Sequence, residues 1–347
     1  MKEHMKEKTI KAVLRRKFND WVDSIEDEGV KKAVKSDAII AGGSIVSLLL
    51  NEKPNDYDVY FRTKATCKKV AQYYVQKWIE QHGEVENRID YAVQPYVIDG
   101  EDVQAWINGR MDIRDFAPNY NSNIPPEQAS GMITNTPADR IKIIFPSDGI
   151  WEEGEQEQGI DEYMEACEDL SEMDADMLEK EHPETEEKGK YRPVFLSTNA
   201  ITLSNKIQIV IRFYGEPDKI FENYDFEHCK CYWDSRDNVL EIPQKSLMCI
   251  INKELFYSGS KYPVCSIIRT RKFLKRGWHI NAGQYLKMCF QVSELDLTDI
   301  NTLEDQLVGV DSLYFLQVVE VLRKQQEKNQ NWRFDSTYLA SVIDRIF

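Results

Sequence analysis

The sequence predicts an α+β protein, with a mixed sheet in its first part and a helical unit at its C-terminal end. Short apolar runs typical of strands alternate with amphipathic helical stretches up to about residue 240. From about residue 246 onward, apolar residues recur at helical spacing alone. A chain of 347 residues is long enough for two packed units of this kind.

The composition fits a folded cytoplasmic protein, with 42% hydrophobic and 11% aromatic residues. No apolar run approaches the roughly 20 residues that a membrane-spanning helix needs. The charged start of the chain lacks the apolar segment of a signal peptide. Seven cysteines without a regular framework indicate free thiols. We therefore expect a cytoplasmic location, with no membrane and no disulfide partner.

The net charge of −15 is concentrated in residues 152–188, which hold seventeen Asp and Glu against two Lys. The rest of the chain is therefore neutral and can still bind a nucleotide or a nucleic acid. Such an acidic composition predicts a solvated insertion, partly helical and partly disordered. An acidic arm that imitates nucleic acid is the alternative hypothesis.

The elements of the first part follow from apolar patterning and from the turn residues between the runs. Helices are expected at 9–35, 44–50, 65–82 and 103–108, and strands at 37–41, 56–61, 88–96, 141–145, 200–203, 207–213 and 226–233. The stretch 117–136 is rich in Asn, Pro, Ser and Thr, which predicts a loop.

The second part predicts helices at 247–255, 267–276, 282–292 and 311–324. Gly277 is the expected C-cap of the second of these. The resulting domain prediction has a helical lead at 1–35, a sheet-based domain at 36–240 and a helical domain at 241–347. An insertion at about 100–190, acidic from 148, interrupts the sheet-based domain.

One constellation in the first part points to phosphate chemistry. Gly42 and Gly43 end a strand before a helix, so the backbone can approach a phosphate closely, and Ser44 adds a hydroxyl. Asp56 and Asp58 alternate along the next strand, so both carboxylates point to one face. Paired carboxylates suit Mg²⁺ or Mn²⁺, and two such ions can activate a hydroxyl and stabilise a departing pyrophosphate.

This pattern of Gly-Gly, about a dozen residues and then Asp-x-Asp resembles the DNA polymerase β-like nucleotidyltransferase superfamily. The spacing is similar to that of the tRNA CCA-adding enzymes and poly(A) polymerases, although Val46-Ser47 replaces the Arg-Asp pair of those enzymes. The whole chain looks like phage-type members of the superfamily. The resemblance implies a polymerase-β-like mixed-sheet palm domain followed by a helical C-terminal domain.

The resemblance also implies a third metal carboxylate on a later strand. Asp225 is the candidate for that role, and Glu227 is the second choice. A basic helix further on is similar to the segment with which CCA-adding enzymes read the incoming base. On this helix Arg269 and Lys272 are candidates for holding the nucleotide or an RNA backbone. The alternative is an ordinary solvated helix face packed through its apolar residues.

The implied function is transfer of a nucleoside monophosphate from an NTP to an acceptor hydroxyl, with release of pyrophosphate. The expected acceptor is the 3′ end of a tRNA-like RNA, and the expected cofactors are two Mg²⁺ or Mn²⁺ ions. Two alternatives remain open: nucleotidylation of a protein or small molecule, and a catalytically inactive relative that acts by binding.

Overall fold

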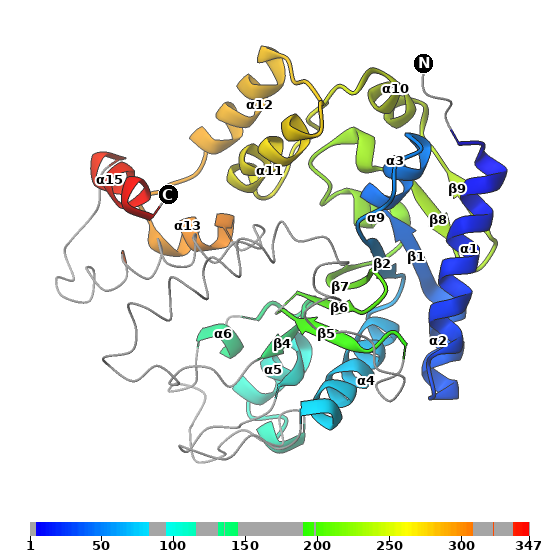
Figure 1. Ribbon diagram of the computed structural model, residues 1–347. Helices are drawn as coiled ribbons and strands as arrows, with labels where there is room; N and C mark the ends of the chain where they lie inside the picture. Colours follow the sequence, from blue (N-terminus) through cyan, green and yellow to red (C-terminus); the bar gives the residue numbers. More distant parts are fainter. Residues whose placement is uncertain are drawn as a thin grey trace. The chain divides into compact units, whose positions relative to one another are not determined.

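The computed structural model describes residues 5–82, 95–115, 131–134, 136–144, 190–197, 199–307, 322 and 336–346 (Figure 1). These residues form two compact units. The first holds the described residues up to Phe221 together with Cys229–Pro243, and the second holds Glu222–His228 and the described residues from Gln244 onward. Parts of four predictions lie outside the described residues: 88–94 of the strand at 88–96, 117–130 and 135 of the loop at 117–136, 148–189 of the acidic insertion, and 311–321 and 323–324 of the helix at 311–324.

The first unit contains the strands and the N-terminal helices. Its helices are α1 (Glu7–Asp23), α2 (Glu28–Asp37), α3 (Gly43–Leu49), α4 (Lys64–His82), α5 (Gly100–Ile107), α6 (Gly131–Thr134) and α9 (Pro217–Phe221), with a 3₁₀ turn at Ile113–Asp115. Its strands are β1 (Ala38–Ala41), β2 (Tyr57–Phe61), β3 (Tyr96–Asp99), β4 (Ile141–Ile144), β5 (Pro193–Leu196), β6 (Ala200–Leu203), β7 (Ile207–Tyr214), β8 (Tyr232–Asp234) and β9 (Val239–Glu241).

Seven of these strands form one mixed sheet in the order β5-β6-β7-β2-β1-β8-β9. Only β2 and β7 pair in parallel within it, and its other neighbours are antiparallel. Strands β3 and β4 form a separate antiparallel pair. No solved structure matches the chain, so the more specific polymerase-β-like palm stays a prediction.

The two faces of the seven-stranded sheet differ in chemistry. One row of side chains crosses the sheet through residues that are all buried, namely Ile201, Ile209, Val59, Ile40, Trp233 and Leu240. The adjacent row points to the other face and is mostly polar: Thr202, Gln208, Asp58, Ala41, Tyr232 and Glu241. We call the face that carries this second row the polar face.

The N-terminal helices cover the apolar face. Phe18 on α1 meets Trp233 edge-on, with ring centroids 5.2 Å apart. Trp21, also on α1, donates from Nε1 to the hydroxyl of Tyr74 on α4 at 2.7 Å. The predicted single helix over 9–35 is divided, because the Asp27 carboxylate accepts a hydrogen bond from the backbone N–H of Val30 and starts α2 anew. The expected helical lead is therefore part of the same unit as the sheet.

The second unit is helical, with α10 (Gln244–Asn252), α11 (Pro263–Lys275), α12 (Ala282–Ser293), α13 (Ile300–Leu307) and α15 (Ser336–Ile346). Helix α11 ends at Lys275, and the predicted capping glycine, Gly277, follows two residues later with a φ of +79°. The N–H of Gly277 donates to Leu274 O, and that of Trp278 donates to Phe273 O. This pair of bonds is the Schellman motif, which satisfies the last carbonyls of the helix.

The predicted strand over 226–233 is not formed as one element. A 3₁₀ turn covers Glu227–Cys229, and only Tyr232–Asp234 continues as β8. Phe226 instead bridges to Tyr257 and packs edge-on against Phe273, so its ring is fully buried among aromatic side chains. The prediction of a strand around Asp225 is therefore wrong.

Among the described residues, no helix is both long and apolar enough to cross a membrane.

Candidate functional site

The polar face of the sheet carries the two predicted metal carboxylates. Asp56 lies just before β2 and Asp58 within it, and both are half-buried. Tyr57, which lies between the two acids, and Val59, which follows them, are buried on the opposite face. The alternation predicted from the Asp-x-Asp spacing thus sets both carboxylates on the face of the strand opposite Tyr57 and Val59.

The glycine turn lies at the same edge of the sheet. Ala41, the last residue of β1, pairs directly with Asp58, so Gly42 and Gly43 follow beside the start of β2. Gly42 has a φ of 85° and a ψ of −142°, a backbone conformation that residues other than glycine rarely adopt. Its N–H donates to Cys231 O at 3.2 Å, which ties the turn to the chain entering β8.

Gly43 and Ser44 differ in their access to a ligand. A Cβ placed on Gly43 would meet nothing within 4 Å, so the backbone there borders open space. The Ser44 side chain is 1% exposed, and its hydroxyl has no hydrogen-bond partner among the described residues. A bound group can thus approach the Gly43 backbone, whereas the Ser44 hydroxyl faces the interior.

Gln208 is a neighbour of Asp58 that sequence reasoning did not select. It lies on β7, directly opposite Asp58 in the parallel pair, and its side chain is half-buried on the polar face. A primary amide beside a carboxylate adds one oxygen acceptor and two donors to the surface. The signal was present in the sequence, because the only polar residue inside the Ile-Gln-Ile-Val-Ile run must point away from the core.

Asp225 and Arg269, predicted for different roles, form an ion pair in the second unit. Arg269 on α11 donates from Nη1 to the Asp225 carboxylate at 2.9 Å. The Asp225 side chain is 9% exposed and that of Arg269 is 44% exposed. Asp225 belongs to the second unit, whereas Asp56 and Asp58 belong to the first. The pairing was not predicted, because it joins residues 44 positions apart.

The other predicted residues of the second unit also have definite positions. Lys272 is exposed on α11, three residues after Arg269. Glu227, the second choice for a metal ligand, lies in the 3₁₀ turn and forms an ion pair with Lys245 at 3.1 Å. Within the ranges that the structure describes, no three His, Cys, Asp or Glu side chains form a group able to hold a metal ion. The two-ion site with Asp225 stays a prediction.

The chain also has recognisable relatives. A family model described as the Gabija anti-defense 2 family matches residues 12–253, well over half of the chain. This chain belongs to the Gabija anti-defense 2 family. The matched region includes every strand of the seven-stranded sheet and the glycine turn with Asp56 and Asp58.

One relative in the family is the protein named Gabija anti-defense 2 of the Bacillus phage SPbetaL7. It is 20% identical to this chain over 143 residues, which are 41% of this chain and 33% of the relative. The match therefore spans about a third of the relative's length. The phage-like character predicted from the sequence agrees with the source of this relative.

The family assignment corrects two predictions. Membership of the DNA polymerase β-like nucleotidyltransferase superfamily is wrong, because the model that matches is that of the Gabija anti-defense 2 family. Transfer of nucleotides to an RNA 3′ end, which depended on that resemblance, is wrong for the same reason, and the RNA acceptor is withdrawn with it. Two glycines followed by Asp-x-Asp form a short pattern, and a short pattern recurs on chains of different descent. The expected cytoplasmic location stays a prediction.

Proposed function

We propose that this protein counteracts a Gabija defence system. The observation that carries the proposal is the match of the Gabija anti-defense 2 family model to residues 12–253. The relative from a Bacillus phage bears the same name and supports it. A protein of this kind benefits the phage only if it blocks the defence while the phage replicates, so protection of phage growth is its measurable effect.

We further propose that the polar face is the working surface and that the protein is a metal-dependent enzyme acting on an NTP. Asp56 and Asp58 present half-buried carboxylates there, and Gln208 adds an amide. These oxygens are ligands of the type that Mg²⁺ and Mn²⁺ prefer. A bound ion would supply positive charge to neutralise phosphate oxygens. The open backbone at Gly43 leaves room for a phosphate beside the carboxylates.

The first experiment measures phage plating on bacteria that carry a Gabija system, with and without this protein. We expect wild type to raise the plating efficiency to near that of bacteria without the defence. A failure of the well-expressed wild-type protein to do so would overturn the proposed anti-defence role. The assay reports the biological role without assuming any chemistry.

The second experiment tests the surface. The variant Asp56→Asn/Asp58→Asn keeps the shape of both side chains and removes both charges, so we expect it to fold and to lose protection. Asp23→Asn, an exposed acid at the end of α1, is the matched control and should protect like wild type. Full protection by the double variant would refute the enzymatic proposal and would leave an anti-defence protein that acts by binding.

A further inference from the structure

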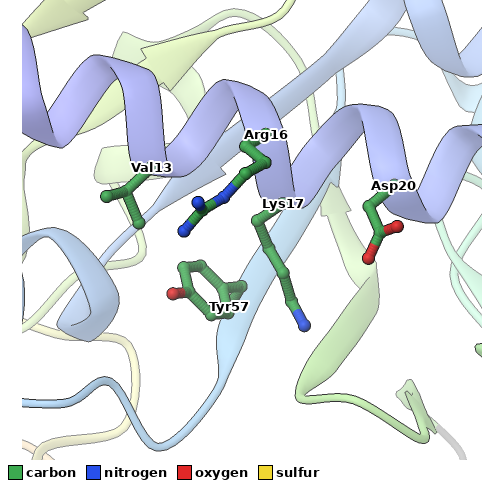
Figure 2. Close-up of a pocket in the computed structure, with 5 residues that line it drawn as sticks. All are labelled: Val13, Arg16, Lys17, Asp20 and Tyr57. Atoms are coloured by element: carbon green, nitrogen blue, oxygen red, sulfur yellow. The ribbon is translucent and has the colours of Figure 1, made fainter.

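A pocket lies on the opposite side of β2 from the Asp56 and Asp58 carboxylates. It has a volume of about 220 Å³ and is lined by Val13, Arg16, Lys17 and Asp20 of α1 and by Tyr57 of β2 (Figure 2). Because successive strand residues point to opposite faces, Tyr57 faces α1 while Asp56 and Asp58 face away from it. The pocket is therefore distinct from the polar face.

Two hydrogen-bond donors in this pocket are available to a ligand. Figure 2 shows the Arg16 side chain reaching from α1 toward the Tyr57 ring. Among the residues that the structure describes, neither the Arg16 guanidinium nor the Tyr57 hydroxyl has a hydrogen bond or an ion pair. Burial raises the pKa of Tyr57 against the opposing effect of Arg16, so the phenol keeps its proton at neutral pH.

The remaining charges leave the pocket positive. Lys17 donates to the backbone oxygen of Asn205, and its ammonium lies 5.5 Å from the centre of the Tyr57 ring. Asp20 accepts from Lys190 Nζ at 2.6 Å and from the Tyr191 hydroxyl at 2.8 Å.

The hydrogen bond from Lys190 is the main reason that the pKa of Asp20 is lowered. The Asp20 carboxylate thus stays ionised, and the Lys190 ammonium neutralises its charge. The Arg16 guanidinium therefore has no carboxylate partner among the described residues and can act on an anion that enters.

We propose that this pocket binds a phosphate group, with the Arg16 guanidinium and the Tyr57 hydroxyl as its donors. A guanidinium binds two oxygens of a tetrahedral oxyanion at once, and a neutral phenol donates to a third. Sites for whole drug-sized ligands occupy about 300–1,000 Å³, so a volume of about 220 Å³ suits free phosphate or a single phosphomonoester group. The site is independent of the proposed function, because it shares none of its side chains with the polar face.

Isothermal titration of the full chain with inorganic phosphate tests this proposal, at constant ionic strength. We expect saturable binding at one site. Arg16→Ala and Tyr57→Phe should each weaken it about tenfold or more, the loss expected for one charge-assisted or one buried hydrogen bond. Arg15→Ala is the matched control, since Arg15 is exposed on the same helix and does not line the pocket.

Melting curves of all variants separate loss of binding from loss of folding. Tyr57→Phe removes only a hydroxyl that has no partner in the described structure, so its melting temperature should equal that of wild type. AMP as a second titrant distinguishes the sources: tighter binding of AMP than of phosphate indicates a phosphomonoester ligand, and equal binding indicates the free anion. Absence of saturable phosphate binding, or an equal loss with Arg15→Ala, would overturn the proposal.

Discussion

Loss of the Asp234 charge should destabilise the first unit far more than loss of the Glu216 charge, although both acids pair with Arg62. Arg62 follows β2 directly, and its side chain is only 4% exposed. It donates from Nη2 to Asp234 on β8 at 2.5 Å and from Nε to Glu216 at 3.0 Å. Its Nη1 is buried without a hydrogen-bond partner among the described residues.

The exposures of the two acids set the expected magnitudes. The Asp234 side chain is 12% exposed, so Asp234→Asn leaves a buried guanidinium without its main counter-charge, which costs about 3–5 kcal/mol. We expect a loss of stability near the lower end of this range, because the side-chain oxygen of the introduced Asn can still accept a hydrogen bond from Arg62. The Glu216 side chain is 67% exposed, and Glu216→Gln should cost about 0–1 kcal/mol because water screens that pair.

Urea unfolding followed by tryptophan fluorescence measures both values, since Trp21 and Trp233 are buried in the same unit. The double variant Arg62→Met/Asp234→Leu should regain most of the stability that Asp234→Asn loses, because it removes the buried guanidinium charge and does not leave it without a counter-charge. Equal effects of Asp234→Asn and Glu216→Gln would refute the reasoning that burial decides the contribution of each pair.

Three further predictions concern single positions. Asp58→Asn should bind Mn²⁺ at least tenfold more weakly than wild type by electron paramagnetic resonance in the presence of ATP, with unchanged circular dichroism; equal affinity would remove Asp58 from any metal site. Burial, assisted by Arg276, lowers the pKa of His228 to about 3. Between pH 6.5 and 3 the unfolded chain therefore binds a proton that the folded chain does not, so wild type should lose up to about 1.4 kcal/mol of stability per pH unit as the pH falls. In urea unfolding at several pH values, His228→Phe should reduce this dependence of the unfolding free energy on pH. An unchanged dependence would show that His228 is not its source. Gly277→Ala should cost about 1 kcal/mol because φ is +79° there, although no atom crowds the new Cβ; an unchanged melting temperature would be the contrary result.

Local patterning determined the central elements of the first unit. The apolar runs and the glycine turn gave β1, α3, β2 and α4 within a residue or two of their observed ends. Such elements are predictable because the side-chain period and the turn residues act over a few neighbouring positions. The placing of Asp56 and Asp58 on one face followed from the same period, and so did the glycine end of α11.

Contacts between distant residues decided the rest. The apolar pattern around Asp225 fits either a strand or a turn. In the structure Phe226 packs against Tyr257 and Phe273, and the chain forms a turn there. The sequence predicted separate roles for Asp225 and Arg269, whereas in the structure they form one ion pair.

The phosphate pocket proposed here is also a product of tertiary structure. Its donors come from α1 and β2, about 40 positions apart. Tyr57 lies between the two carboxylates of the Asp-x-Asp pattern, but nothing in that pattern links it to Arg16. Sequence alone determined the central helices and strands of the first unit, because there the choice depends on near neighbours. Only the packed structure decided which side chains meet, because burial and charge pairing depend on the whole fold.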